Sequence, residues 1–171
     1  MRHNTRRGLH AVLAVAALLA GLAGSVSHQS AQAQRAPSPV PVPSEDAAMA
    51  QAIAKAQATL PGFFELLAKP LPGDDGFAVK IHYKLGASGG EHIWANDVQR
   101  NGNDVTATIN NTPQRIPNLK LGERVTVPID RITDWMFFRG DKIHGGQTMR
   151  ALLPRLSKVE ADKLRSILAP E

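Results

Sequence analysis

Three histidines and two carboxylates are the residues of this sequence with the clearest capacity for chemistry. His82, His92 and His144 are the histidines that follow residue 33, and Glu91 and Asp134 are carboxylates that could join them. Such groups bind divalent metals or transfer protons. The spacing of the three histidines matches no helical metal motif, so only tertiary structure could bring them together. We therefore expect no metal and no other cofactor.

Covalent mechanisms find little support in the residue types. The sequence contains no cysteine, which excludes thiol nucleophiles, thiolate metal sites and disulfides. Ser88 lies in a glycine-rich stretch, and nothing beside it predicts that its hydroxyl is activated. This pattern favours binding over catalysis.

Aromatic and polar residues of the types common at binding sites occur in three short segments. The candidates are Glu91, His92 and Trp94, then Asp134 and Trp135, then His144, Thr148 and Arg150. Asp134 alternates with apolar Ile132 and Met136 on one strand face, so a buried carboxylate there needs a partner. Arg150 is the expected partner, because a guanidinium pairs with a carboxylate through two hydrogen bonds.

The elements that must position these residues follow from the spacing of apolar side chains. Helical spacing from Met49 to Leu60 predicts a helix, with Ser44 as its N-cap and Pro61-Gly62 as its end. Alternation predicts about five antiparallel strands, at 77–83, 91–98, 105–109, 125–129 and 132–138. It places His92, Trp94, Asn96 and Val98 on one face of the second strand.

Turn and cap signals complete the predicted architecture. Asn101-Gly102 is a strong hairpin signal, and Gly145-Gly146 predicts a tight turn into a helix. Ser157 and Glu160 fit a capping box at the start of a last helix. We expect an α+β fold with an N-terminal helix, an antiparallel sheet of about five strands and short C-terminal helices.

Two segments precede this domain, which we place at 46–171. Residues 1–33 combine a basic start, an apolar run at 9–23 and Ala31-Gln32-Ala33, as is typical of a signal peptide cleaved after Ala33. Residues 34–45 place proline at every second position, which predicts an extended linker. We expect a periplasmic or secreted protein with no transmembrane segment after cleavage.

The charge distribution argues against a nucleic-acid partner. The formal net charge is +5, but three of the 20 basic residues lie in the predicted signal peptide. The remaining 17 basic residues face 15 acidic residues and alternate with them in sign. A surface that follows phosphates would cluster its basic residues.

Four local patterns then carry a family resemblance. They are Ala52-Ile53-Ala54-Lys55-Ala56, Glu91-His92-Ile93-Trp94, Ile132-Thr133-Asp134-Trp135-Met136 and Gly145-Gly146-Gln147-Thr148-Met149-Arg150. In this order they resemble the YegJ-like bacterial family, known as domain of unknown function 2314. The resemblance covers roughly residues 47–153 and leaves the last helix outside. It implies an α+β domain and no established activity.

These patterns together predict a non-enzymatic, exported binding module, with a protein or a cell-envelope component as its partner. A hydrolase-like or metal-assisted enzyme that uses Glu91, His92 and Asp134 is an alternative. A second alternative is an immunity-like protein that neutralises a toxin, which rests only on the small exported form of the family.

Overall fold

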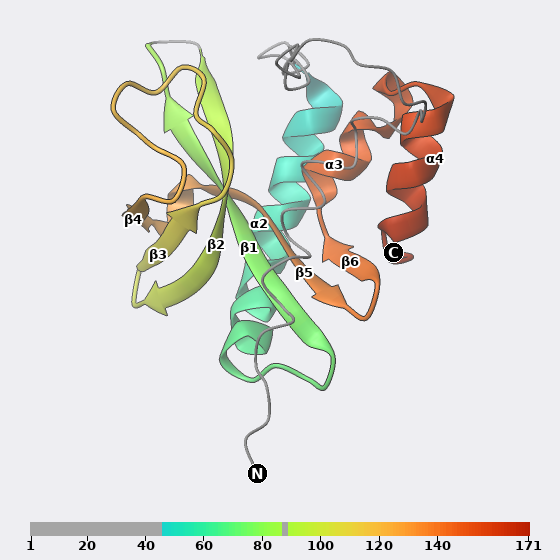
Figure 1. Ribbon diagram of the computed structural model, residues 1–171, viewed down its shortest axis with the longest axis horizontal. Coiled ribbons are helices and arrows are strands. Elements are labelled where there is room, and N and C mark those ends of the chain that lie inside the picture. The colour runs from blue at the N-terminus through green and yellow to red at the C-terminus, as the bar shows by residue number, and fades with distance from the viewer. Residues whose placement is uncertain (1–45, 87–88) are drawn as a thin grey trace, which may run out of the picture. The chain divides into compact units, whose positions relative to one another are not determined.

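The chain folds as an α+β domain in a computed structural model that describes residues 46–86 and 89–171 (Figure 1). Its helices are α2 (Ala47–Ala68), α3 (Gln147–Leu152) and α4 (Lys158–Ile167). Its strands are β1 (Asp74–Lys84), β2 (Gly90–Asn101), β3 (Asp104–Ile109), β4 (Arg124–Pro128), β5 (Ile132–Arg139) and β6 (Lys142–Gly145). The predicted fold class is confirmed. The predicted signal peptide, the linker and Ser44 lie outside the described residues.

The strands form one antiparallel sheet in the order β4-β3-β2-β1-β5-β6. It has six strands instead of the predicted five, because the chain turns at Gly140-Asp141 and β6 pairs with β5. Only four residues long, β6 shows too little alternation to be recognised from sequence. The predicted hairpin between β2 and β3 is present, with Gly102 and Asn103 at its turn, one residue later than expected.

Helix α2 continues through Pro61, where the sequence predicted its end. Asp46 is the N-cap, and its carboxylate accepts hydrogen bonds from two first-turn N–H groups at 3.1 and 3.3 Å. An internal proline costs about 3 kcal/mol, because it lacks an N–H and its ring crowds a carbonyl. Phe63 and Phe64, on the next turn, are buried in the core. Burial of two such side chains contributes about 1.5–3 kcal/mol each, which offsets the proline.

A β-bulge in β2 changes which side chains share a face. The register against β3 shifts after Asn96, and Asp97 has a positive φ of 51°. Val98 therefore joins Ile93 in the core, and the prediction that Val98 shares the face of Trp94 is wrong. One extra residue in a strand reverses its alternation, and apolar spacing alone does not reveal the extra residue.

A second bulge acts in the same way in β5. Asp134 pairs with Lys80 of β1, but the next β1 residue, Ile81, pairs with Ile132, so Thr133 is the extra residue. Ile132 therefore lies in the core with Ile81. Asp134 is on the opposite face with Lys80, so the predicted shared face of Ile132 and Asp134 is wrong.

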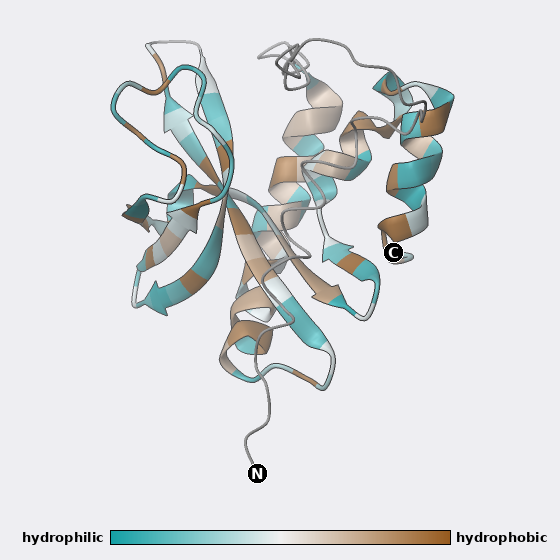
Figure 2. Ribbon diagram, in the orientation of Figure 1, coloured by the Kyte–Doolittle hydropathy of each residue, from teal (hydrophilic) through white to brown (hydrophobic). Residues whose placement is uncertain are grey.

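Helix α2 packs on one face of the sheet and forms the main core with it. Figure 2 shows brown and tan residues along α2 and β5, where the two elements meet. The fully buried members of this core include Phe63, Val79, Ile81, Ile93, Val105, Ala107 and Ile109. Across the described ranges, no helix combines the length and apolar character needed to cross a membrane.

The C-terminal part of the chain packs on α2 and β6. Helix α3 lies beside α2 in Figure 1, and Leu168, just after α4, forms a parallel bridge with Ile143 of β6. The predicted capping box of Ser157 and Glu160 starts α4. Between β6 and α3 the chain turns at Gly145 and Gly146, which have φ values of 80° and 64°.

The turn before α3 tolerates no side chain at Gly145. A Cβ there would collide with the Trp135 carbonyl oxygen and would lie 2.6 Å from the Trp135 ring. The positive φ of Gly145 also disfavours any residue other than glycine. We expect Gly145→Ala to lower the free energy of unfolding by about 2–4 kcal/mol in urea denaturation. Gly102→Ala is the matched control: its φ is 61° but its Cβ would meet no atom within 4 Å, so it should cost about 1 kcal/mol. Equal losses would contradict the steric explanation.

Candidate functional site

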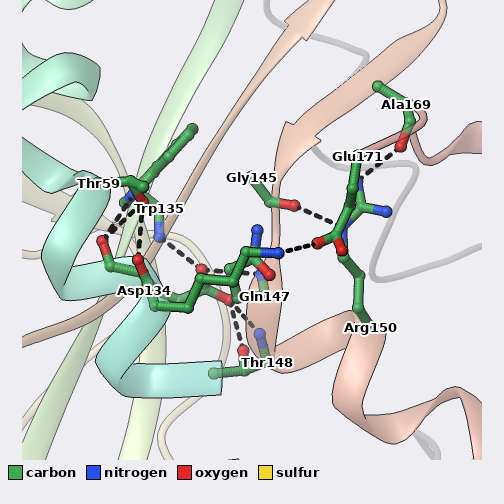
Figure 3. A network of polar contacts seen from close by, with 11 residues as sticks. Thr59, Asp134, Trp135, Gly145, Gln147, Thr148, Arg150, Ala169 and Glu171 are labelled. Atoms are coloured by element: carbon green, nitrogen blue, oxygen red, sulfur yellow. Dashed lines mark hydrogen bonds and ion pairs between the residues drawn. The ribbon is translucent and has the colours of Figure 1, made fainter. Parts of the chain in front are cut away.

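The carboxylate of Asp134 is the buried polar centre of the domain, with 1% of the residue exposed. Its Oδ1 accepts hydrogen bonds from the backbone N–H groups of Trp135 and Gln147 at 2.9 and 3.1 Å. Its Oδ2 accepts from the Thr148 N–H at 2.8 Å and from the Thr148 hydroxyl at 2.6 Å (Figure 3). The predicted pairing with Arg150 is wrong, because Trp135 of β5 and the first turn of α3 supply these donors instead.

Lys80 extends this network across the sheet. Its Nζ donates to the Thr148 hydroxyl at 2.7 Å and lies 4.8 Å from the centre of the Trp94 ring. Burial lowers the pKa of Lys80, and the negative charge of Asp134 acts in the opposite direction. The Thr148 hydroxyl thus lies between the Lys80 amino group and the Asp134 carboxylate. The ring of half-buried Trp94 packs against Lys80.

Two of the three metal-candidate histidines lie side by side. The rings of His82 and His92, on paired strands β1 and β2, stack with centres 4.5 Å apart. His92 Nδ1 is 2.9 Å from the Thr133 hydroxyl. The residue is exposed at the sheet surface, but desolvation of its ring, followed by the neighbouring His82 and Lys80, lowers the pKa of His92 to about 4. Burial also lowers the pKa of His82, so both rings are neutral at pH 7.

The third histidine and Glu91 lie apart from this pair. His144, on β6, stacks on Phe137 with ring centres 5.0 Å apart. The Glu91 carboxylate accepts hydrogen bonds from the N–H groups of Gln114 and Arg115 at 2.7 and 2.8 Å. It thereby holds the loop before β4. Within 46–86 and 89–171, no group of three or more His, Asp or Glu side chains is placed to hold a metal.

Glu91, His92 and Asp134, the residues of the alternative enzyme hypothesis, therefore contact different parts of the chain. Glu91 and His92 are successive residues of β2, so their side chains point to opposite faces of the sheet. Asp134 contacts the start of α3 instead of either of them.

Trp135 of β5 stabilises the packing of α2 on the sheet. Its indole N–H donates to the Ala56 carbonyl at 3.0 Å and lies 3.2 Å from the Thr59 hydroxyl. Its ring packs against Phe63, with ring centres 5.3 Å apart. These contacts give the predicted binding residue Trp135 a structural role.

Arg150 and His144 line a small surface pocket of about 230 Å³. Arg150 is held in place by two carbonyls: its Nε donates to Gly145 at 3.0 Å and its Nη2 to Ala169 at 2.8 Å (Figure 3). Burial, followed by the charge of Arg139, lowers the pKa of His144. The full lining is Lys55, His144, Gly145, Gln147, Arg150, Ala169, Pro170 and Glu171.

Sequence reasoning missed several polar residues of these sites. Lys55 and Gln147 lie in the family motifs without any mark of a site, and Lys80 has the sequence context of an ordinary polar strand residue. No local signal marks Lys80, because its partner Thr148 is 68 residues away.

A further sequence motif surrounds Ser88. Residues 86–90 spell Gly-x-Ser-x-Gly, the pattern of a nucleophile elbow. That elbow joins a strand to a helix, whereas this stretch joins the antiparallel strands β1 and β2. Ser88 lies outside the described residues.

Asp134→Asn tests the buried carboxylate. The amide keeps one acceptor oxygen and turns an NH₂ group toward backbone donors, so we expect a loss of about 2–4 kcal/mol in the free energy of unfolding. Asp162→Asn on α4, whose side chain is half exposed, should change it by about 0.5 kcal/mol or less. Urea denaturation measures both, and a similar small loss for the two variants would show that Asp134 is not a structural centre.

The stacked histidines predict a pH dependence. Because the pKa of His92 falls from 6.5 to about 4 on folding, the unfolded chain binds more protons between these values. The contribution of His92 to the free energy of unfolding is therefore fully present above pH 6.5 and is lost as the pH falls toward 4. Chemical denaturation of the wild type and of His92→Asn at pH 4.5 to 7.5 should show a shallower fall for the variant. Parallel curves would contradict this assignment.

Comparison with known proteins agrees with the resemblance seen in the motifs. Residues 46–167 match the family described as "Uncharacterized protein conserved in bacteria (DUF2314)". The chain is 36% identical over 125 residues to the uncharacterized protein YegJ of Escherichia coli (strain K12), which covers 71% of this chain and 77% of that protein. It is also 36% identical over 70 residues to a putative ankyrin repeat protein of Neisseria meningitidis serogroup B, covering 41% of this chain and 28% of that protein. No solved structure matches it.

The family match extends further than the motifs suggested. It continues to residue 167 and so includes α4, which the sequence resemblance left outside. The matched range contains every predicted binding residue, from Glu91 to Arg150, and nearly all of the described domain. On this match, and on the identity to YegJ over most of both chains, the protein belongs to the DUF2314 family of bacterial proteins.

Proposed function

We propose that this protein is an exported, non-enzymatic binding module that works in the periplasm and recognises a protein or a cell-envelope component. The observation that carries the proposal is the pocket between β6, α3, α2 and the segment after α4. Two residues predicted for binding from sequence, His144 and Arg150, line it. The export step is supported by the signal-peptide pattern of residues 1–33.

The pocket is held in shape before any partner arrives. Asp134 fixes the first turn of α3, and Arg150 is anchored by two backbone carbonyls. A site that is already ordered loses less conformational entropy on binding. This rigidity supports recognition of a partner at the surface of the fold.

The size and chemistry of the pocket favour a partner that inserts one small polar group. Sites for drug-sized molecules and cofactors occupy about 300–1,000 Å³, whereas this pocket has about 230 Å³. Its polar side chains include the cations Lys55 and Arg150. A binding role also agrees with the contacts of Glu91 and Asp134, whose carboxylates are engaged by backbone N–H groups.

The proposal predicts that pocket variants lose a partner without losing the fold. Lys55→Ala and Gln147→Ala should each weaken capture of an envelope component about fivefold or more, which corresponds to about 1 kcal/mol at an interface. The measurement is quantitative mass spectrometry of periplasmic and cell-wall material retained on the immobilised protein, with the melting temperature recorded for each variant.

Arg165→Ala is the matched control for this experiment. Arg165 is an exposed cation on α4 outside the pocket, so its removal should leave capture unchanged. Partners retained equally by the wild type and both pocket variants would refute a binding role for the pocket.

A further inference from the structure

The pocket already contains a carboxylate from its own chain. Glu171 Oε1 lies 2.7 Å from Lys55 Nζ. It also lies 3.6 Å from Arg150 Nε, and Figure 3 shows Glu171 beside Arg150. The hydrogen bond from Lys55 is the main reason that the pKa of Glu171 is lowered. Cations from two different helices, α2 and α3, thus converge on one acidic group.

The two cations differ in how firmly they are held. The Arg150 side chain is 18% exposed and is fixed by the Gly145 and Ala169 carbonyls. Lys55 and Glu171 are each about half exposed, at 50% and 49%. Ion pairs this exposed are weak, so Glu171 can leave while Arg150 stays in place.

The Arg150 guanidinium has capacity for a further acceptor. Among the described residues, its Nε and Nη2 groups donate to carbonyls and no hydrogen bond involves Nη1. Gln147 lines the same pocket with an amide group. A carboxylate that replaced Glu171 would meet Lys55, Arg150 and Gln147 together, a donor set suited to an anion with two oxygens.

We infer that the ligand of this pocket is a carboxylate presented by an acidic peptide segment of a partner protein, and that Glu171 is a built-in competitor for the same place. This inference rests on the proposed function and names its ligand. A pocket of about 230 Å³ fits one acidic side chain or one chain end. Glu171 itself is such a group, held by the same cations.

Competition of this kind has a defined consequence for affinity. A ligand binds only the fraction of molecules in which Glu171 has left, so the apparent dissociation constant equals the intrinsic constant divided by that fraction. Removing the charge of Glu171 therefore tightens binding of an acidic peptide. Removing Lys55 as well takes away a cation that the peptide itself needs.

The experiment uses the full mature chain and fluorescein-labelled short peptides. One probe carries an internal glutamate between glycines with a blocked C-terminus, a second has glutamine in its place, and a third has only a free C-terminal carboxylate. Fluorescence anisotropy at low salt gives each dissociation constant for the wild type, Glu171→Gln, Glu171→Gln with Lys55→Gln, and the control Asp162→Asn.

We expect Glu171→Gln to bind a carboxylate probe about two- to fivefold more tightly than the wild type. The glutamine probe should not bind, the double variant should lose the gain, and Asp162→Asn should behave like the wild type. The two carboxylate probes distinguish a side chain from a chain end as the source. Equal binding by the wild type and Glu171→Gln, or equal binding of the glutamate and glutamine probes, would overturn the inference.

Melting temperatures show whether the variants fold, and Glu171→Ala provides a second route to the open pocket. If Lys55→Ala loses an envelope partner while no carboxylate probe binds Glu171→Gln, the ligand class is wrong and the binding role stands. If Lys55→Ala keeps every partner, the binding role itself fails.

Discussion

The buried carboxylate of Asp134 sets the main constraint on this fold. A charge taken out of water costs several kcal/mol unless hydrogen bonds replace its hydration, so the chain must bring donors to it. One donor is the neighbouring Trp135 N–H, and the others come from the first turn of α3, through the backbone of Gln147 and the backbone and hydroxyl of Thr148. That turn reaches Asp134 because Gly145 and Gly146 adopt positive φ values that other residues avoid.

The position of α3 then determines the pocket. Arg150 follows Thr148 by two residues on the same short helix, and its guanidinium reaches back to the carbonyl of Gly145. The other wall depends on α2, which Trp135 fastens to β5 through the Ala56 carbonyl. Asp134 and Trp135 are neighbours in one strand, so a single segment of β5 positions both helices that line the pocket.

The face of β1 and β2 that points away from the core carries three basic side chains whose charged forms are disfavoured by burial. Burial lowers the pKa of Lys80, His82 and His92, and the two imidazoles stack beside each other. The Lys80 side chain contacts Thr148 and Trp94, whereas the imidazoles have no carboxylate partner among their described contacts. The two histidines therefore contribute a pH-sensitive part of the stability, and neither of them lines the pocket.

Local signals in the sequence determined the classes and order of most elements, because caps, hairpin turns and apolar spacing act over a few residues. The Ser157 cap, the hairpin near Gly102 and the α+β class follow from such signals. Tertiary structure alone decided that α2 continues past Pro61, since buried aromatic side chains outweigh the local preference of proline. It also decided that Asp134 pairs with Thr148 and that Arg150 faces the pocket, because partner choice depends on bulges and packing between distant segments.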